Sequence, residues 1–140
     1  MNDALKLTYE ISGDDFTRAG EASGDAKRKL KQIGISPEAV RKVAIAMYEG
    51  EINMVIHADG GKIDVIISPE AITMILADKG PGIKDIEKAM QAGFSTAPDN
   101  IRALGFGAGM GLPNMKKYSD DMKIETELGV GTTVTMKVNM

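Results

Sequence analysis

D-K-G-P-G-I (Asp78 to Ile83) and G-F-G-A-G-M-G-L (Gly105 to Leu112) open and close the segment around which the rest of the chain is organised. Seven of the sixteen glycines lie in this segment: Gly80, Gly82, Gly93, Gly105, Gly107, Gly109 and Gly111. Glycine costs backbone entropy on folding, so this density indicates a backbone that turns with positive φ or approaches a ligand closely. A phosphate-bearing ligand accounts for both.

The second glycine cluster leads directly into L-P-N-M-K-K-Y, residues that can form a short helix. Backbone N–H groups of a glycine-rich loop and of a helix start converge on anions. The chain has no Walker motif, and no buried strand runs straight into the glycines as a dinucleotide-binding fingerprint requires. A glycine-rich surface loop that binds nothing stays open as the alternative.

Length and composition limit the other classes of protein. With 140 residues, 43% of them hydrophobic, we expect a single domain over residues 1–140. The apolar stretches are too short to span a bilayer, and the first residues lack the pattern of a signal peptide, which predicts a cytoplasmic protein. A net charge of −3 without a basic block argues against nucleic acid as the partner. The absence of cysteine excludes disulfides and thiolate metal sites.

Periodicity and turn residues predict the elements. Residues 5–11 alternate like a half-buried strand, and a helix is expected from Asp15 to about Ile33, where Gly34 ends it. Ser36 and Pro37 begin a second helix that extends to about His57. Further along, we expect strands at 62–67, 71–76, 123–128 and 132–138, a short helix at 83–92 and a loop at 93–104.

The helix that begins at Pro37 carries a candidate pair of functional residues. Its apolar positions recur at spacings of three and four, which predicts one core-facing side made of Val40, Ala44, Met47, Tyr48, Ile52 and Val55. Glu49 and Asn53 lie one turn apart on a shared polar side, where an amide oxygen can ligate Mg²⁺ and a carboxylate can accept a proton. Glu51 offers a second acid on the side away from Asn53. A solvated helix face without function is the alternative.

Asp78 follows the predicted strand 71–76 and stands just before the first glycines. A carboxylate at a strand end can accept a hydrogen bond from an exocyclic amine, which would let a pocket favour adenine over guanine.

Four motifs, taken in order, resemble those of the GHKL ATPases, the superfamily of DNA gyrase and the histidine kinases. They are E-G-E-I-N-M-V-I-H-A (Glu49 to Ala58), D-K-G-P-G (Asp78 to Gly82), G-F-G-A-G-M-G-L (Gly105 to Leu112) and G-V-G-T (Gly129 to Thr132). They match the N-box, the two glycine boxes and the closing Gly-Thr. Within the superfamily the chain most resembles the small anti-sigma-factor serine kinases and the stressosome switch kinases.

The resemblance implies a role for each matching residue. Glu49 looks like the general base, Asn53 like the Mg²⁺ ligand and Asp78 like the aspartate that reads adenine, with Thr132 assisting through its hydroxyl. Residues 95–103 would form an ATP lid. The other implied ATP-binding residues belong to the glycine boxes: Gly80, Gly82, Gly105, Gly107, Ala108, Gly109, Met110, Gly111 and Leu112.

The fold that the resemblance implies is a two-layer Bergerat sandwich, an α/β fold with a mixed sheet, helices on one face and a bound Mg·ATP. The implied function is phosphorylation of a serine or threonine on a STAS-domain antagonist protein in partner switching. An ATP-gated anti-sigma binding module without kinase activity is the alternative. A sigma factor or a phosphatase is a further candidate partner, and a homodimer is left open.

Overall fold

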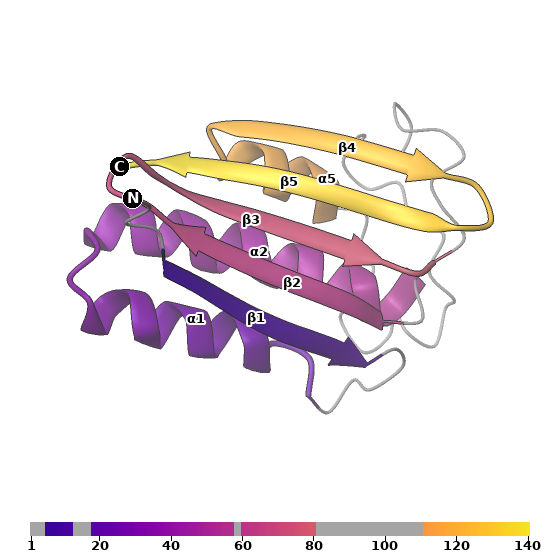
Figure 1. Cartoon of the computed structure of the whole chain (residues 1–140), viewed down its shortest axis with the longest axis horizontal. Helices are drawn as coiled ribbons and strands as arrows, with labels where there is room; N and C mark the ends of the chain where they lie inside the picture. Colours follow the sequence, from indigo (N-terminus) through magenta and orange to yellow (C-terminus); the bar gives the residue numbers. More distant parts are fainter. Residues whose placement is uncertain (1–4, 13–17, 58–59, 81–110) are drawn as a thin grey trace.

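The computed structural model describes residues 5–12, 18–57, 60–80 and 111–140, which form two layers (Figure 1). A five-stranded sheet is one layer, and the helices pack against one of its faces. In chain order the elements are β1 (Leu5–Ser12), α1 (Glu21–Gln32), α2 (Pro37–His57), β2 (Gly60–Ile67), β3 (Ala71–Asp78), α5 (Gly111–Lys117), β4 (Asp121–Glu127) and β5 (Gly131–Asn139). The predicted α/β sandwich is confirmed.

The strands lie in the order β1-β2-β3-β5-β4, and all four pairings between them are antiparallel. Only three residues separate β2 from β3 and β4 from β5, and strands joined by such short turns pair antiparallel. Among the described strands the sheet is therefore antiparallel throughout, where the sequence led us to expect a mixed one.

The core lies between the sheet and the helices. Alternate residues of each central strand point into it, as Val134, Met136 and Val138 of β5 do. α2 lies over the middle of the sheet, with α1 on one side of it and α5 on the other (Figure 1). α2 is both central and the longest of the three described helices, so it contributes more buried residues than either neighbour. No helix in the described ranges combines the length and the apolarity that crossing a membrane requires.

α1 ends as predicted but begins later. Gly34 adopts φ 87°, and the N–H of Ile35 donates to the carbonyl of Leu30 at 3.1 Å, which is the hydrogen bond of a Schellman C-cap. At the other end, residues 18–20 form a turn, and the helix starts at Glu21. Gly20 has φ 98°, a left-handed conformation outside the helix, so it sets the start that the apolar pattern placed earlier.

α2 has the bounds that the sequence predicts. The Ser36 hydroxyl accepts a hydrogen bond from the N–H of Ala39 at 3.3 Å, as an N-cap residue does. The predicted core side is partly wrong, because Tyr48 is 39% exposed while Val43 and Ala46 are fully buried. Since α2 has a helix on each side and the sheet beneath, its buried surface is wider than a single stripe.

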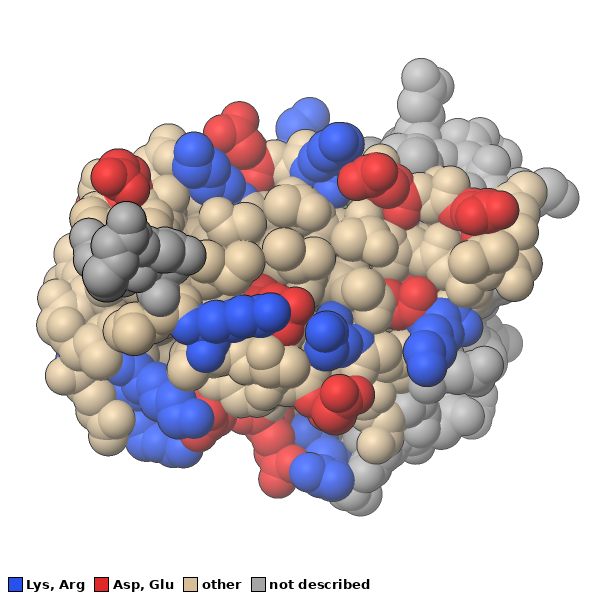
Figure 2. Space-filling model, in the orientation of Figure 1, with Lys and Arg blue, Asp and Glu red and all other residues tan. Residues whose placement is uncertain are grey.

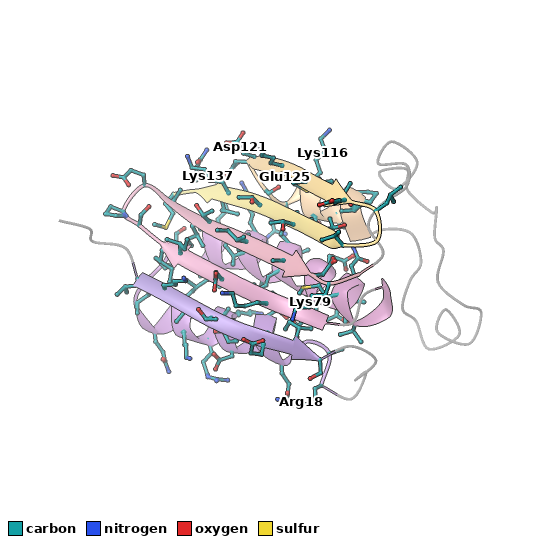
Figure 3. The ribbon with its side chains drawn as sticks, turned by 45° about the vertical axis from the view of Figure 1, so that its right-hand side comes forward. Arg18, Lys79, Lys116, Asp121, Glu125 and Lys137 are labelled. Atoms are coloured by element: carbon teal, nitrogen blue, oxygen red, sulfur yellow. The ribbon has the colours of Figure 1, made fainter. Side chains whose placement is uncertain are left out.

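None of the helices in the described part of the chain lies on the other face of the sheet. Figure 2 shows this face, where uncharged side chains form a band over the central strands and charged side chains gather on either side. The band includes Thr73, Ile75 and Thr135, which are half-buried. Figure 3 shows Asp121 and Glu125 of β4 and Lys137 of β5 along one border. Core and surface residues therefore alternate along these strands.

Candidate functional site

The candidate site lies at the end of the sheet where β1 and β3 end and where β2 and β5 begin. Antiparallel pairing brings these termini together: Ser12 is opposite Gly60, and Gly61 is opposite Asp78. α2 reaches the same end, because only two residues separate it from β2. Figure 3 shows Lys79 there, just after β3, with Arg18 before the start of α1. The fold thus brings the C-terminal part of α2 and the end of β3 to the same end of the sheet, as the candidate site requires.

Asp78 is fixed by two backbone hydrogen bonds. Its Oδ1 accepts one from the N–H of Thr132 at 3.0 Å and one from the N–H of Gly80 at 2.9 Å. Both use the same oxygen, and within the described ranges nothing donates to Oδ2. The carboxylate is half-buried. One oxygen therefore orients the side chain, while the other can accept a hydrogen bond from a ligand.

Two glycines pack against the end of β3 so closely that neither has room for a side chain. A Cβ built on Gly61 of β2 would lie 2.2 Å from the carbonyl oxygen of Ala77. A Cβ on Gly131 of β5 would lie 2.2 Å from the carbonyl oxygen of Asp78. From the sequence, Gly131 was assigned to the closing Gly-Thr motif, and Gly61 was not singled out as a site residue. Their position at the ends of strands was the available signal, because a glycine in a strand can mark a place where another backbone approaches closely.

Thr132 touches Asp78 through its backbone. Its side chain is buried, and its hydroxyl lies 2.9 Å from the hydroxyl of Thr126 on β4. The resemblance implied a direct contribution of the Thr132 hydroxyl to the ATP site. In the structure this hydroxyl pairs with Thr126, and the N–H of Thr132 is what orients the aspartate.

Glu49 lies on the half-buried side of α2 that faces α5. Burial raises the pKa of its carboxyl group, and a hydrogen bond from the Asn114 side chain opposes this by lowering the pKa. Partial burial outweighs the hydrogen bond, so the Glu49 carboxylate binds a proton more readily than an exposed glutamate. A carboxylate of this kind suits a group that must accept a proton near neutral pH.

Asn53 is one turn further along α2 and also contacts α5. Its Nδ2 lies 3.9 Å from the sulfur of Met115, a buried residue next to Asn114. Since this contact uses the amide nitrogen, the carboxamide oxygen is the atom that could bind a cation. Two consecutive residues of α5 thus contact the two candidate residues of α2. Neither Asn114 nor Met115 carries a local sequence signal for such a contact, so neither was predicted individually.

Glu51, the second acid that the sequence offered, has a different environment. Its side chain is 2% exposed. Its two oxygens accept hydrogen bonds from the backbone N–H groups of Gly20, Ala22 and Ser23 at 3.0, 3.1 and 3.0 Å. These groups form the first turn of α1, which has no side-chain cap of its own. Glu51 therefore caps a neighbouring helix, and Glu49 is the acid left to face a ligand.

The glycine boxes are only partly described. Gly80 donates its N–H to Asp78, Gly111 begins α5, and the Leu112 side chain packs in the core. The remaining predicted ligand-binding residues, namely Gly82, Gly105, Gly107, Ala108, Gly109 and Met110, lie outside the described residues, as do the expected helix 83–92 and the lid 95–103.

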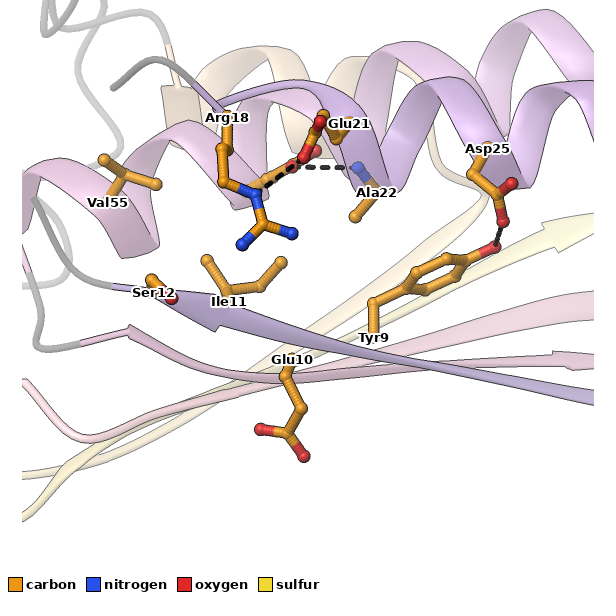
Figure 4. Close-up of a pocket in the computed structure, with 10 residues that line it drawn as sticks. Tyr9, Glu10, Ile11, Ser12, Arg18, Glu21, Ala22, Asp25 and Val55 are labelled. Atoms are coloured by element: carbon orange, nitrogen blue, oxygen red, sulfur yellow. Dashed lines mark hydrogen bonds and ion pairs between the residues drawn. The ribbon is translucent and has the colours of Figure 1, made fainter. Parts of the chain in front are cut away.

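A pocket of about 240 Å³ lies away from these residues, between β1, the start of α1 and α2 (Figure 4). Ile11, Ala22 and Val55 are among the residues that line it, and Arg18 pairs with Glu21 at 2.9 Å beside them. Figure 4 shows Glu10 pointing to the other side of β1. Glu51, the second acid of α2, also lines this pocket, whereas Glu49, Asn53 and Asp78 are not among the described residues that line it.

Comparison with known proteins gives a consistent result. The family model described as histidine kinase-like ATPase domain matches residues 15–138. A protein of Caldanaerobacter subterraneus subsp. tengcongensis named anti-sigma F factor is 33% identical over 94% of this chain and 89% of its own length. Anti-sigma F factors of Clostridium acetobutylicum and Geobacillus stearothermophilus are 34% and 35% identical, over 95% of this chain and 90% and 88% of their own lengths.

The two-layer sandwich, with an acid and an amide on its central helix and an aspartate at a strand end, defines a GHKL-type ATPase domain. The chain belongs to the histidine kinase-like ATPase domain family. The resemblance drawn from the four sequence motifs is confirmed at this level.

Proposed function

We propose that this chain is an ATP-dependent serine/threonine protein kinase that phosphorylates a STAS-domain antagonist protein in a partner-switching system. The ATPase family and the anti-sigma F factor names of the relatives support this proposal. The observation that carries the choice of a kinase is the position of Glu49. It is a half-buried acid one turn before Asn53, and its carboxylate is not engaged in capping a helix as that of Glu51 is.

The described residues fit Mg·ATP. Oδ2 of Asp78 would accept a hydrogen bond from the amino group of adenine, and this assignment is supported by the two backbone N–H groups that bind Oδ1. The carboxamide oxygen of Asn53 is a hard ligand of the kind that Mg²⁺ prefers. When bound, ATP supplies the phosphoryl group, and Mg²⁺ supplies the positive charge that neutralises the phosphate oxygens.

Glu49 would act as the base toward the partner protein. Its carboxylate would accept the proton of the serine or threonine hydroxyl while that oxygen bonds to the terminal phosphorus of ATP and ADP leaves. Phosphoryl transfer depends mainly on positioning and charge neutralisation, so one base on a rigid helix is sufficient equipment for the protein. Anchoring by α5, through Asn114 and Met115, keeps the turn that carries Glu49 and Asn53 in place.

The decisive experiment uses the purified protein, labelled ATP and a STAS-domain protein encoded beside it. We expect label to move to a serine or threonine of the STAS protein, and calorimetry to show binding of ATP and ADP in preference to GTP. Absence of nucleotide binding at millimolar concentration would contradict the ATP site. Binding without transfer to any STAS partner would instead favour the binding module, an activity that the name anti-sigma factor of the relatives also describes.

The pH dependence of transfer should report on Asn114. Because its hydrogen bond lowers the pKa of Glu49, Asn114→Ala should leave burial as the dominant influence and raise that pKa further. A base must be deprotonated to act, so the acidic limb of the kcat profile should move to higher pH, while the rates converge in alkaline solution. Stopped assays from acidic to alkaline pH measure this displacement of the limb.

The matched control for Asn114→Ala is Lys116→Ala, an exposed change on the same helix. An acidic limb in the same place for Asn114→Ala and the parent would show that Asn114 does not act on the base. A displaced limb in the Lys116 variant would show that any change in α5 has this effect.

A further inference from the structure

Glu51 joins two parts of the molecule that the proposed function treats separately. It belongs to α2, in the same turns as Glu49 and Asn53, yet its carboxylate binds the first turn of α1. The three hydrogen bonds have ordinary lengths, and all three donors are backbone N–H groups whose positions depend on the path of the chain. A charged acceptor makes such bonds about twice as strong as neutral ones.

The start of α1 has no comparable anchor of its own. Gly20 occupies the N-cap position, and no side chain of α1 caps the helix. The Ser23 hydroxyl donates to the carbonyl of Gly20, so it leaves the N–H groups to Glu51. Conversely, α2 cannot rotate about its own axis without breaking the three hydrogen bonds that Glu51 accepts from these N–H groups. The contact therefore fixes the rotation of α2 as much as it caps α1.

We propose that Glu51 is a positioning residue for the nucleotide site, which it couples to the start of α1. The inference rests on the proposed function, because it assumes that Glu49 and Asn53 face the nucleotide. Glu51 precedes Asn53 by two residues and follows Glu49 by two, so on a rigid helix its anchoring sets the direction of both. A nucleotide that holds this turn in place would in return hold the α1 start, since coupling between two sites is reciprocal.

Amide exchange measures this coupling directly. NMR-detected exchange at the N–H groups of Gly20, Ala22 and Ser23 should be slower with saturating Mg·ATP than without it, although these groups lie on the other helix. Opening of these hydrogen bonds requires the Glu51 turn of α2 to move, and the bound nucleotide restrains that turn. If Mg·ATP leaves exchange unchanged at all three groups, the proposal is overturned. This measurement needs no variant.

Glu51→Gln provides the second test. A glutamine keeps the shape but has one acceptor oxygen and one NH₂ group, so at least one N–H of α1 loses its acceptor. In a sample shown to be folded by circular dichroism, we expect the dissociation constant of Mg·ATP to rise by about fivefold or more, the lower end of typical coupling. The nucleotide should also no longer slow exchange in the first turn of α1.

Tyr9→Phe is the matched control. The Tyr9 hydroxyl donates to Asp25 of α1 at 2.7 Å, so this variant also loosens α1, but from β1 and without touching α2. It should bind Mg·ATP like the parent and keep the slowed exchange. If folded Glu51→Gln binds Mg·ATP as tightly as the parent, or if both variants lose the same affinity for Mg·ATP, Glu51 only caps α1 and does not influence the site. A parent that binds no Mg·ATP contradicts the proposed function itself, whereas binding without slowed exchange contradicts only the role of Glu51.

Discussion

Glu49→Gln is expected to bind ATP like the parent and to transfer phosphate to the partner protein roughly 10²–10⁴-fold more slowly, the contribution of general-base catalysis. Glutamine has nearly the same shape as glutamate, so the α2–α5 contact persists. It cannot accept a proton near neutral pH, so the partner hydroxyl loses its base. Single-turnover transfer of labelled phosphate, with calorimetry on the same samples, separates the two effects.

Glu38→Gln is the control for this change, because Glu38 is an exposed acid in the first turn of the same helix. Its Oε1 lies 3.9 Å from Nζ of Lys42, at the end of α2 that is far from the site. The variant should therefore transfer phosphate at the parental rate. If Glu49→Gln also transferred at that rate, Glu49 would not be the base and the kinase assignment would lose its central residue.

Asp78→Asn should weaken ATP binding by about 1.5–3 kcal/mol, the typical value of a hydrogen bond to a charged group, which corresponds to roughly 10- to 150-fold in affinity. The Asn oxygen can keep the two N–H groups of Gly80 and Thr132. Its NH₂ group then takes the place of Oδ2 and faces the amino group of adenine, so two donors oppose each other. Guanine presents an acceptor at that position, and the preference for ATP over GTP should shrink.

Asp64→Asn makes the same chemical change on the open face of the sheet, where Asp64 accepts a hydrogen bond from Thr8 at 2.9 Å. This control should bind nucleotides like the parent. Calorimetry with ATP and GTP on both variants, after thermal melting has established that each is folded, tests the assignment. Unchanged ATP affinity in Asp78→Asn would remove Asp78 from the adenine pocket.

Local signals predicted the helices and strands well where a cap or turn residue accompanied the apolar pattern. α2 begins after Ser36 and α1 ends at Gly34, and both positions follow from the conformations that these residue types favour. The start of α1 was placed too early because apolar periodicity does not report a left-handed glycine such as Gly20. Val43 and Ala46 were left out of the predicted core because the apolar pattern cannot show how many neighbours a helix will have.

The candidate site was predictable as a set of residues but not as a set of contacts. Motif spacing predicted Glu49, Asn53 and Asp78 as site residues, and the fold brings the elements that carry them to one end of the sheet. Their partners come from distant elements: Asn114 from α5 and Thr132 from β5. Nothing near Glu51 in the sequence indicated that its carboxylate would cap α1, since that contact spans about thirty residues. Such pairings arise only when helices pack.

The glycines beside the end of β3 set a limit on protein engineering. A designer who wished to change the base preference of the pocket would begin with position 78 and then randomise its surroundings. Gly61 and Gly131 should be left out of such a library, because even alanine at either position would collide with the backbone of β3. The collision would displace the carbonyl groups of Ala77 or Asp78, and with them any new side chain introduced at position 78. Variation is better directed to residues such as Thr126, whose contact with Thr132 is made through side-chain hydroxyls and not through the backbone.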